Sequence, residues 1–157
     1  MKIRLEPVTV ASRAAVERLE TAPGQEGFVE SVAECLAEAD RRRCWRPVGV
    51  YDGDALIGFA MYGFFWEYLP FGRLWLDRLL IDRRFQGRGY GRAALAALLE
   101  RLEREYHKKR IYLSVVEANR PAAALYESFG FRFTGERDTH GAVSYTHLRA
   151  HETLMNL

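Results

Sequence analysis

Apolar and polar positions alternate along several short segments of the chain, and this two-residue period predicts β-strands. The pattern predicts strands from residue 3 to residue 8 and over residues 47–51, 55–66, 74–81, 111–115 and 131–134. Between the second and third of these strands, an Asp-Gly-Asp sequence is typical of a hairpin turn.

A 3.6-residue period predicts helices in the remaining segments. Helices are expected over residues 14–19 and 27–39, and over a long segment that follows a glycine-rich loop. Asn119 is expected to cap a further helix, with Pro121 tolerated in its first turn and Gly130 at its end. The order strand, loop, helix, strand, helix, strand predicts an α/β or mixed α+β sheet domain.

Length and composition are those of one folded domain. The chain has 157 residues, of which 48% are apolar and 28% are charged, and this balance is typical of globular proteins. A run of about 18 apolar residues is lacking, so no membrane span is predicted, and the first residues lack the apolar core of a secretory leader. Cys35 and Cys44 are too few for a disulfide framework. We therefore expect a reduced, cytoplasmic protein without a membrane partner.

The net charge of +2 conceals two segments of opposite sign. Residues 19–40 contain six acidic and no basic side chains, whereas residues 83–110 contain nine basic and three acidic ones. One part of the molecule is therefore expected to attract cations and another part anions. The basic residues cluster around the glycine-rich loop and do not form an interleaved aromatic platform on which bases could stack, so nucleic-acid binding is not expected.

The stretch QGRGYG, residues 86–91, lies between an apolar strand and a long predicted helix. Helix N-termini carry unpaired N–H groups and a partial positive charge, and glycines let the backbone approach an anion closely. A dinucleotide fingerprint is excluded because Arg92 stands where glycine is required, and Arg92-Ala93 after Gly91 excludes a Walker A loop. Glycine content alone leaves two interpretations open, a turn without a ligand and a phosphate site to which Arg88 and Arg92 add charge.

The fuller pattern, QxxGxG beginning at Gln86 between that strand and that helix, resembles the signature of the GNAT superfamily of acetyl-CoA-dependent N-acetyltransferases. The segment NRPAAALYESFGF, which contains Asn119 and Tyr126, resembles the family's helix after the fifth strand. The resemblance covers roughly residues 3–136. It implies a mixed, mostly antiparallel central sheet flanked by helices, with splayed central strands.

The resemblance also implies acetyl-CoA as cosubstrate. Loop amides of the family grip its pyrophosphate, and the corresponding residues here are Gln86, Gly87, Arg88, Gly89, Tyr90, Gly91 and Arg92. Splayed strands expose amides to the pantetheine arm, which places Leu79, Leu80 and Ile81 along the cofactor. In this arrangement the Leu80 N–H is the expected oxyanion donor. Asn119 is expected near the cofactor, and Tyr126 near the sulfur as the general acid.

Two of these assignments have structural alternatives. The helical spacing of Ala122, Tyr126 and Phe129 also suits a ring buried in the core. Asp77 is a candidate to hold the amine or accept its proton, and equally a candidate for a structural ion pair with a nearby arginine. Neither cysteine resembles a nucleophile, so direct attack in a ternary complex is expected. The histidines show no metal-ligand spacing, and no metal is expected.

The acidic segment favours a cationic acceptor. Glu30 and Glu34 are one turn apart on the expected helix, and a row of carboxylates suits a polyamine such as spermidine, although most such stripes are solvated helix faces. The segments QEGFVESVAECLAEA and WLDRLLIDRRFQGRGYG resemble the bacterial spermine/spermidine (diamine) acetyltransferase subgroup. The resemblance implies N-acetylation of a polyamine substrate, with Glu30, Glu34 and Asp77 at the amine.

Other functions stay open at this point. A peptide N-terminal acetyltransferase and an aminoglycoside acetyltransferase share the expected donor chemistry, and aminoglycosides are also polycations. A non-catalytic acetyl-CoA-binding module is an alternative of a different class. Members of the family usually form homodimers, so the resemblance also implies a homodimer. No residue of this sequence points to one independently.

The last fifteen residues, 143–157, differ from what the resemblance implies. The subgroup is expected to close with a short apolar strand after a turn near Gly141, whereas VSYTHLRAHETLMNL resembles a translated sequencing-library adapter. We therefore expect one acetyltransferase domain over residues 1–142 and a non-native tail in place of the last strand. Because apolar and polar residues alternate over residues 143–148, this part can still pair as a strand.

Overall fold

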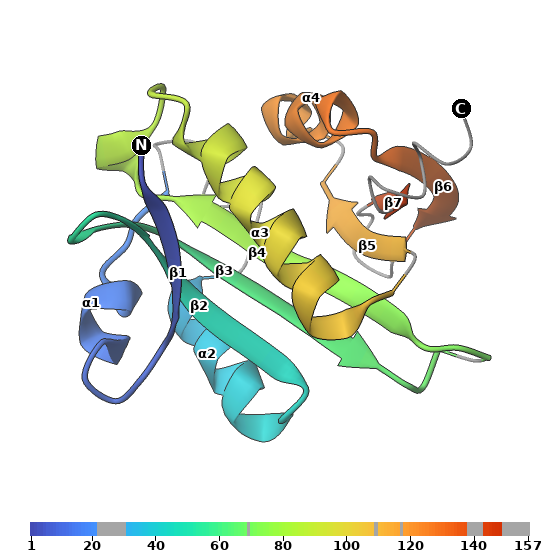
Figure 1. The fold of residues 1–157 in the computed structure, drawn as a ribbon, viewed down its shortest axis with the longest axis horizontal. Coiled ribbons are helices and arrows are strands. Elements are labelled where there is room, and N and C mark those ends of the chain that lie inside the picture. The colour runs from blue at the N-terminus through green and yellow to red at the C-terminus, as the bar shows by residue number, and fades with distance from the viewer. Residues whose placement is uncertain (22–30, 69, 109, 117, 138–142, 149–157) are drawn as a thin grey trace.

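A sheet with helices on both faces organises the chain (Figure 1). The computed structural model describes residues 1–157 apart from 22–30, 69, 109, 117, 138–142 and 149–157. In chain order the elements are β1 (Ile3–Pro7), α1 (Arg13–Glu17), α2 (Val32–Arg41), β2 (Trp45–Asp52), β3 (Ala55–Phe65), β4 (Arg73–Ile81), the short 3-10 helix η1 (Arg83–Phe85), α3 (Tyr90–Tyr106), β5 (Arg110–Val115), α4 (Arg120–Ser128), β6 (Arg132–Arg137) and β7 (Val143–Leu148).

The described residues form seven strands in the order β1-β2-β3-β4-β5-β7-β6. Neighbouring strands are antiparallel except β4 and β5, which run parallel. Within the described residues, β4 and β5 share only the register pairs Leu74–Ile111 and Trp75–Tyr112. Beyond Trp75 the two strands separate, and the sheet opens between them. This mixed, mostly antiparallel α+β sheet with splayed strands confirms the expected fold class.

A β-bulge lies in β4 next to the point where that strand leaves β5. The register of β4 against β3 skips Asp77, which is therefore the extra residue of the bulge. One extra residue reverses the alternation of side chains along a strand. Leu76 accordingly packs in the apolar cluster beside α3, whereas Leu80 packs in the cluster beside α1 and α2.

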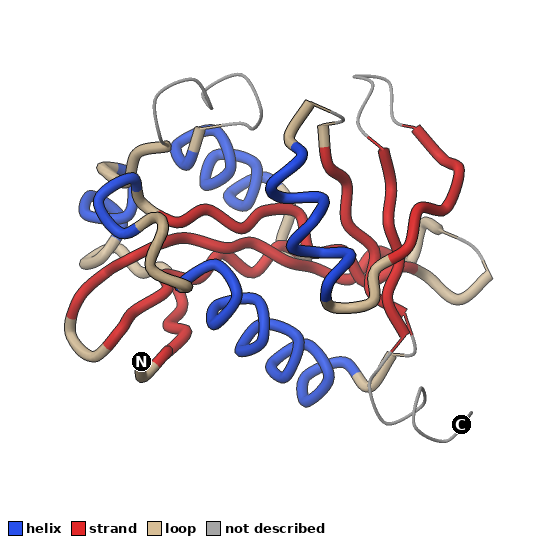
Figure 2. The backbone as a smooth tube through the Cα atoms, turned by 90° about the horizontal axis from the view of Figure 1, so that it is seen from above, coloured by secondary structure: helices blue, strands red, loops and turns tan. Residues whose placement is uncertain are grey.

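Helix α3 covers one face of the sheet, and α1 and α2 cover the other (Figure 2). Leu95, Leu98 and Leu102 recur at helical spacing in α3 and are fully buried against the sheet. Each such side chain contributes about 1.5–3 kcal/mol relative to an exposed one. Among the described residues, no helix is long and apolar enough to cross a membrane. The two apolar layers thus hold β3 and β4 from both sides.

Helix α2 begins at Val32, and the expected start at residue 27 is wrong. Ser31 has an extended backbone and forms a capping box with Glu34. The Ser31 hydroxyl accepts the Glu34 N–H at 3.1 Å, and the Glu34 carboxylate accepts the Ser31 N–H at 3.4 Å. This reciprocal pair sets the start of the helix, which hydrophobic spacing alone does not indicate. Residues 22–30 lie outside the described part of the chain.

Residues 143–148 form β7, which lies between β5 and β6 in the sheet. Its register with β5 runs from Val143 opposite Val115 to Leu148 opposite Arg110. The alternating pattern of this segment is thus sufficient for a strand, as expected. The division into a domain of residues 1–142 and a non-native tail stays a prediction.

Candidate active site

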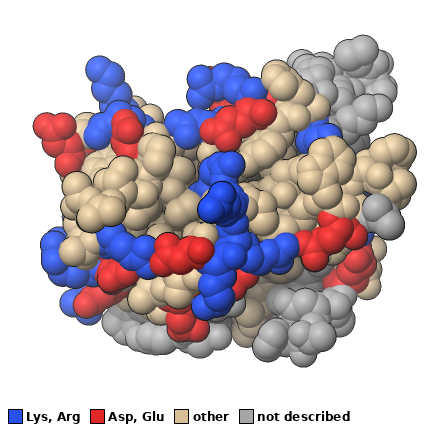
Figure 3. Space-filling view, turned by 90° about the horizontal axis from the view of Figure 1, so that it is seen from below, with Lys and Arg blue, Asp and Glu red and all other residues tan. Residues whose placement is uncertain are grey.

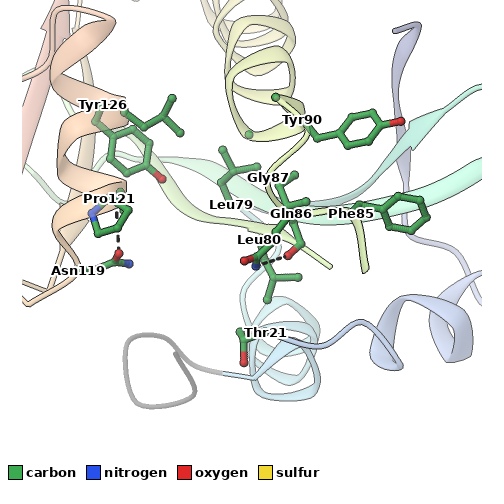
Figure 4. Close-up of a pocket in the computed structure, with 15 residues that line it drawn as sticks. Thr21, Leu79, Leu80, Phe85, Gln86, Gly87, Tyr90, Asn119, Pro121 and Tyr126 are labelled. Atoms are coloured by element: carbon green, nitrogen blue, oxygen red, sulfur yellow. Dashed lines mark hydrogen bonds between the residues drawn. The ribbon is translucent and has the colours of Figure 1, made fainter. Parts of the chain in front are cut away.

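A cavity of about 280 Å³ opens at the end of β4, between the start of α3 and helix α4 (Figure 4). Its wall comes from the segment after α1, the last residues of β4, the glycine loop and α4. The lining residues are Thr21, Leu79, Leu80, Ile81, Phe85, Gln86, Gly87, Gly89, Tyr90, Gly91, Asn119, Pro121, Ala122, Leu125 and Tyr126. The structure therefore gathers most of the residues that the sequence suggested for the cosubstrate around one cavity.

The glycine loop forms the N-terminal end of α3. Gly87 and Gly89 have φ angles of 76° and 85°, in the left-handed region that favours glycine. Gly89 is the N-cap residue and offers no side-chain oxygen to the first N–H groups of the helix. Gln86 anchors the start of the loop, because its Nε2 donates to the carbonyl oxygen of Ile81 at 2.9 Å. The helix therefore presents N–H groups and a partial positive charge to the cavity.

Gly91 is explained neither by its backbone conformation nor by packing within the protein. Its φ angle is not positive, and a Cβ atom there would lie 3.6 Å from Cδ2 of Leu125, an ordinary contact. Because Gly91 lines the cavity, the missing side chain leaves room for a molecule that lies against the helix. A diphosphate held by a helix N-terminus needs such an approach. The residues present thus fit the diphosphate of coenzyme A.

The backbone of β4 directs alternate N–H groups toward the opening in the sheet. Asp82 N donates to Ile57 O at 2.9 Å across β3 and β4, and bonded pairs alternate with non-bonded pairs along an antiparallel ladder. Leu80 lies two residues before Asp82 in the same register, so its N–H points toward β3. The N–H groups of Leu79 and Ile81 point the other way, where β4 has separated from β5. Leu80 N–H is thus directed away from the opening, contrary to expectation.

Tyr126 projects from α4 into the cavity, with its hydroxyl directed toward the side where Leu79 lies (Figure 4). Asn119 caps α4 as expected, since its Oδ1 accepts the Ala122 N–H at 3.4 Å. Only 9% of Tyr126 is exposed, and its ring packs edge-on against Phe131 with the ring centroids 5.7 Å apart. The same side chain is therefore part of the core and part of the cavity wall.

Burial raises the pKa of the Tyr126 phenol to about 12, against an opposing effect of the positive charge of Arg78. An ordinary tyrosine already titrates only near pH 10. The Tyr126 hydroxyl is therefore protonated at neutral pH and can donate a hydrogen bond or a proton into the cavity.

The two arginines of the loop, Arg88 and Arg92, are not part of the cavity wall. The Nη2 atom of Arg92 donates to Ser128 Oγ at 2.9 Å, and its guanidinium lies 5.1 Å from the ring centroid of Phe129. The guanidinium of Arg88 lies 5.7 Å from the ring centroid of Phe85. Both charges thus lie beside the loop rather than inside the cavity.

Of the acidic residues predicted at the amine, the two that the structure describes, Glu34 and Asp77, do not line the cavity. Glu34 belongs to the capping box of α2, Asp77 is exposed at the bulge of β4, and Glu30 lies outside the described residues. Other acids of residues 19–40 form ion pairs, namely Glu20 with Arg83 at 3.0 Å, Glu38 with Arg41 at 2.7 Å and Asp40 with Arg13 at 2.9 Å. On the face seen from below, acidic and basic side chains are interspersed (Figure 3). Two of these partners, Arg83 and Arg13, are distant in sequence and offset part of the charge that the segment carries.

Five cavity residues were not predicted as site residues: Thr21, Phe85, Pro121, Ala122 and Leu125. Pro121 and Ala122 were expected only as parts of the helix that Asn119 caps. Phe85 directly precedes the glycine loop, and this position in the sequence could have identified it as a cavity residue. Leu125 precedes Tyr126 in α4 and could have been inferred with it. Thr21 carries no local signal, because hydrogen bonds between segments distant in sequence bring it to the cavity.

Comparison with known proteins identifies the family. The model of the Acetyltransferase (GNAT) family matches residues 13–131 of the chain. The spermine/spermidine N(1)-acetyltransferase of Bacillus subtilis (strain 168) is 45% identical over 144 residues, which amount to 90% of this chain and 95% of that protein.

Two solved structures share the fold. The aminoglycoside acetyltransferase AAC(6')-Ib in complex with coenzyme A has a TM-score of 0.81 at 19% identity, covering 99% of this chain and 100% of that chain. The spermidine N-acetyltransferase of Vibrio cholerae in complex with CoA and spermine has a TM-score of 0.73 at 18% identity, covering 95% of this chain and 96% of that chain. With the family match over most of the chain, these findings lead to one conclusion: the chain belongs to the GNAT acetyltransferase family and is an enzyme that uses acetyl-CoA as cosubstrate.

Proposed function

We propose that this enzyme transfers the acetyl group of acetyl-CoA to a primary amine of a polyamine such as spermidine or spermine. The observation that carries the proposal is the high identity to the Bacillus spermine/spermidine acetyltransferase over nearly the whole chain. The cavity supports the donor half of the reaction. The choice of a polyamine as the acceptor is based on the similarity to that relative.

The glycine loop is the proposed binding site for the diphosphate of acetyl-CoA. The first N–H groups of α3 donate hydrogen bonds to it, and Gly87, Gly89 and Gly91 let it approach the backbone. Arg88 and Arg92 add positive charge beside the loop, which increases the local concentration of an anionic ligand. Substitution of either arginine is therefore expected to weaken binding without abolishing it.

The last residues of β4 and helix α4 supply the proposed catalytic groups. When bound, acetyl-CoA supplies a thioester whose carbonyl carbon is open to attack by a neutral amine. The proposed donor to the developing oxyanion is the Leu79 N–H, and the register of β4, which turns the Leu80 N–H toward β3, supports this choice over Leu80. The Tyr126 hydroxyl, kept protonated by its burial, donates a hydrogen bond or a proton to the departing thiolate. Asn119 holds the start of α4 and so keeps Tyr126 at the cavity.

Carboxylates are the proposed contacts for the acceptor amine, which attacks directly in a ternary complex. Asp77 is placed by the bulge where β4 leaves β5, so its carboxylate lies on the strand that borders the opening. Glu34 accepts the Ser31 N–H with Oε1 and keeps a second carboxylate oxygen with which it can bind an ammonium group. Glu30 completes the proposed set. Of these, Asp77 is the first to test.

An acceptor panel tests the proposal. Acetyl-CoA turnover is measured for the complete chain with spermidine, spermine, putrescine, an aminoglycoside and a peptide with a free N-terminus. The proposal expects kcat/KM for at least one polyamine to exceed the other values by about tenfold or more. Robust turnover of the peptide or the aminoglycoside without polyamine turnover would refute it. Binding of acetyl-CoA without turnover of any amine would instead indicate a non-catalytic module.

A further inference from the structure

Asp82 is a nearly buried carboxylate that the proposed chemistry does not use. It is 2% exposed, directly follows β4 and caps η1, the short helix that leads into the glycine loop. A buried carboxylate is costly unless several hydrogen bonds satisfy its oxygens. The groups that donate those hydrogen bonds therefore show which segments of the chain Asp82 connects.

The hydrogen-bond donors to Asp82 come from two segments that are distant from each other in sequence. Oδ1 of Asp82 accepts the Glu20 N–H at 2.9 Å. Oδ2 accepts the Arg84 N–H at 3.2 Å and the Arg84 Nε at 2.7 Å. Burial acts to raise the pKa of Asp82, but these bonds outweigh it and lower the pKa below its usual value. Asp82 is thus an anion held between the segment after α1 and the start of the loop.

A second contact closes the same junction. The Arg83 N–H donates to the carbonyl oxygen of Glu20 at 2.8 Å, so Glu20 is bonded through both of its backbone groups. Thr21, the next residue, lines the cavity on the side where Leu80 lies (Figure 4). The position of Thr21 relative to the loop therefore depends on Asp82 and its immediate neighbour.

We propose that Asp82 is a positioning residue for acetyl-CoA, which holds Thr21 and the start of the glycine loop at a fixed spacing across the cavity. This inference rests on the proposed placement of acetyl-CoA in that cavity. It is independent of which amine accepts the acetyl group.

Asp82→Asn tests the inference because asparagine has the same shape but a single acceptor oxygen. Its NH2 group must face either the Glu20 N–H or the donors of Arg84, so one of the two connections is lost. The expected result is an increase of about tenfold in KM for acetyl-CoA and in Kd for coenzyme A by calorimetry, with kcat changed far less. Arg84→Gln is the matched control, since it removes the guanidinium, with its bond to Asp82 and its contact with the Phe85 ring, but keeps both backbone N–H bonds to Asp82. It is expected to leave both constants within about twofold.

The readouts separate positioning from folding. A lower melting temperature for Asp82→Asn with unchanged KM and Kd would overturn the inference, because a purely structural role predicts that result. If Asp82→Asn does not fold, Asp82→Ser replaces it, since serine keeps a capping oxygen for the Arg84 N–H on a shorter side chain. Failure of both variants to fold would assign Asp82 to folding and overturn the inference as well.

Gly89→Val separates this inference from the proposed site. Valine strains the left-handed N-cap of α3 and therefore disturbs the loop itself. If Gly89→Val abolishes coenzyme A binding while Asp82→Asn leaves it intact, the inference fails and the site stands. If neither variant weakens binding, the placement of acetyl-CoA in this cavity fails, and the inference with it.

Discussion

Gly58 of β3 is not itself a cavity residue but lies beside the last residues of β4, so alanine at this position should disturb the cavity by displacing that strand. A Cβ atom at Gly58 would lie 2.4 Å from the carbonyl oxygen of Leu80 and 3.1 Å from Cδ1 of Ile81. Both of these residues line the cavity. Because the shorter contact is with a backbone atom, it can be relieved only when β4 moves away from β3.

The size of the effect follows from that distance. An ordinary contact of about 3.4 Å requires a displacement of β4 by about 1 Å at Leu80. Overpacking of this kind lowers the free energy of unfolding by about 1–3 kcal/mol. The melting temperature should fall by about 2–12 °C for a chain of this size. Misplacement of a catalytic group by about 1 Å can cost about a hundredfold in rate, so kcat/KM should fall about ten- to a hundredfold.

Gly63→Ala is the matched control. Gly63 lies on the same strand as Gly58 but away from the cavity, and a Cβ atom there would lie 2.7 Å from the carbonyl oxygen of Cys44. Thermal unfolding should show a similar loss of stability for both variants. Steady-state kinetics, at a temperature where both are folded, should show the catalytic loss in Gly58→Ala alone. Equal catalytic losses, or an active Gly58→Ala with a lowered melting temperature, would refute the reasoning.

Four further predictions concern the acid, the core and the last strand. Tyr126→Phe keeps the ring but removes the hydroxyl, so kcat should fall about a hundredfold or more while the Kd for coenzyme A stays within about twofold; an unchanged kcat would assign the ring to the core alone. Because burial raises the pKa of Tyr126 to about 12, its deprotonation should cause no loss of kcat between about pH 7 and 10, and a basic limb that disappears in Tyr126→Phe would contradict this. Leu98→Ala empties a fully buried position and should lower the free energy of unfolding in urea by about 2–5 kcal/mol. Truncation after residue 142 removes β7, which pairs with β5 and β6, and should lower the melting temperature; an unchanged value would show that β7 does not stabilise the sheet.

The parts of the site that the sequence predicts are those with local causes. The glycine loop follows from residue order around Gln86, and Asn119 follows from the chemistry of a helix cap, so both appear where expected. The presence of a strand over residues 74–81 also follows from local pattern. Its amide directions do not, because they depend on the register against β3, which is set by tertiary pairing.

Other features depend on contacts between segments distant in sequence. The acidic appearance of residues 19–40 is partly offset by arginines elsewhere in the chain. Thr21 reaches the cavity through hydrogen bonds of Glu20 with Asp82 and Arg83. Local pattern cannot reveal such contacts.

The separation of β4 from β5 makes one side of a central strand behave as an edge strand. Edge strands can bind an extended partner through main-chain hydrogen bonds, and proteins usually cover or blunt them. Here the exposed side of β4 borders the cavity between the start of α3 and helix α4, which leaves room for a slender ligand. The amides of Leu79 and Ile81 should therefore exchange with solvent hydrogen faster than those facing β3, and slow down when acetyl-CoA is added. Bound as proposed, the cosubstrate would take the place of a missing strand, and its binding would complete the sheet.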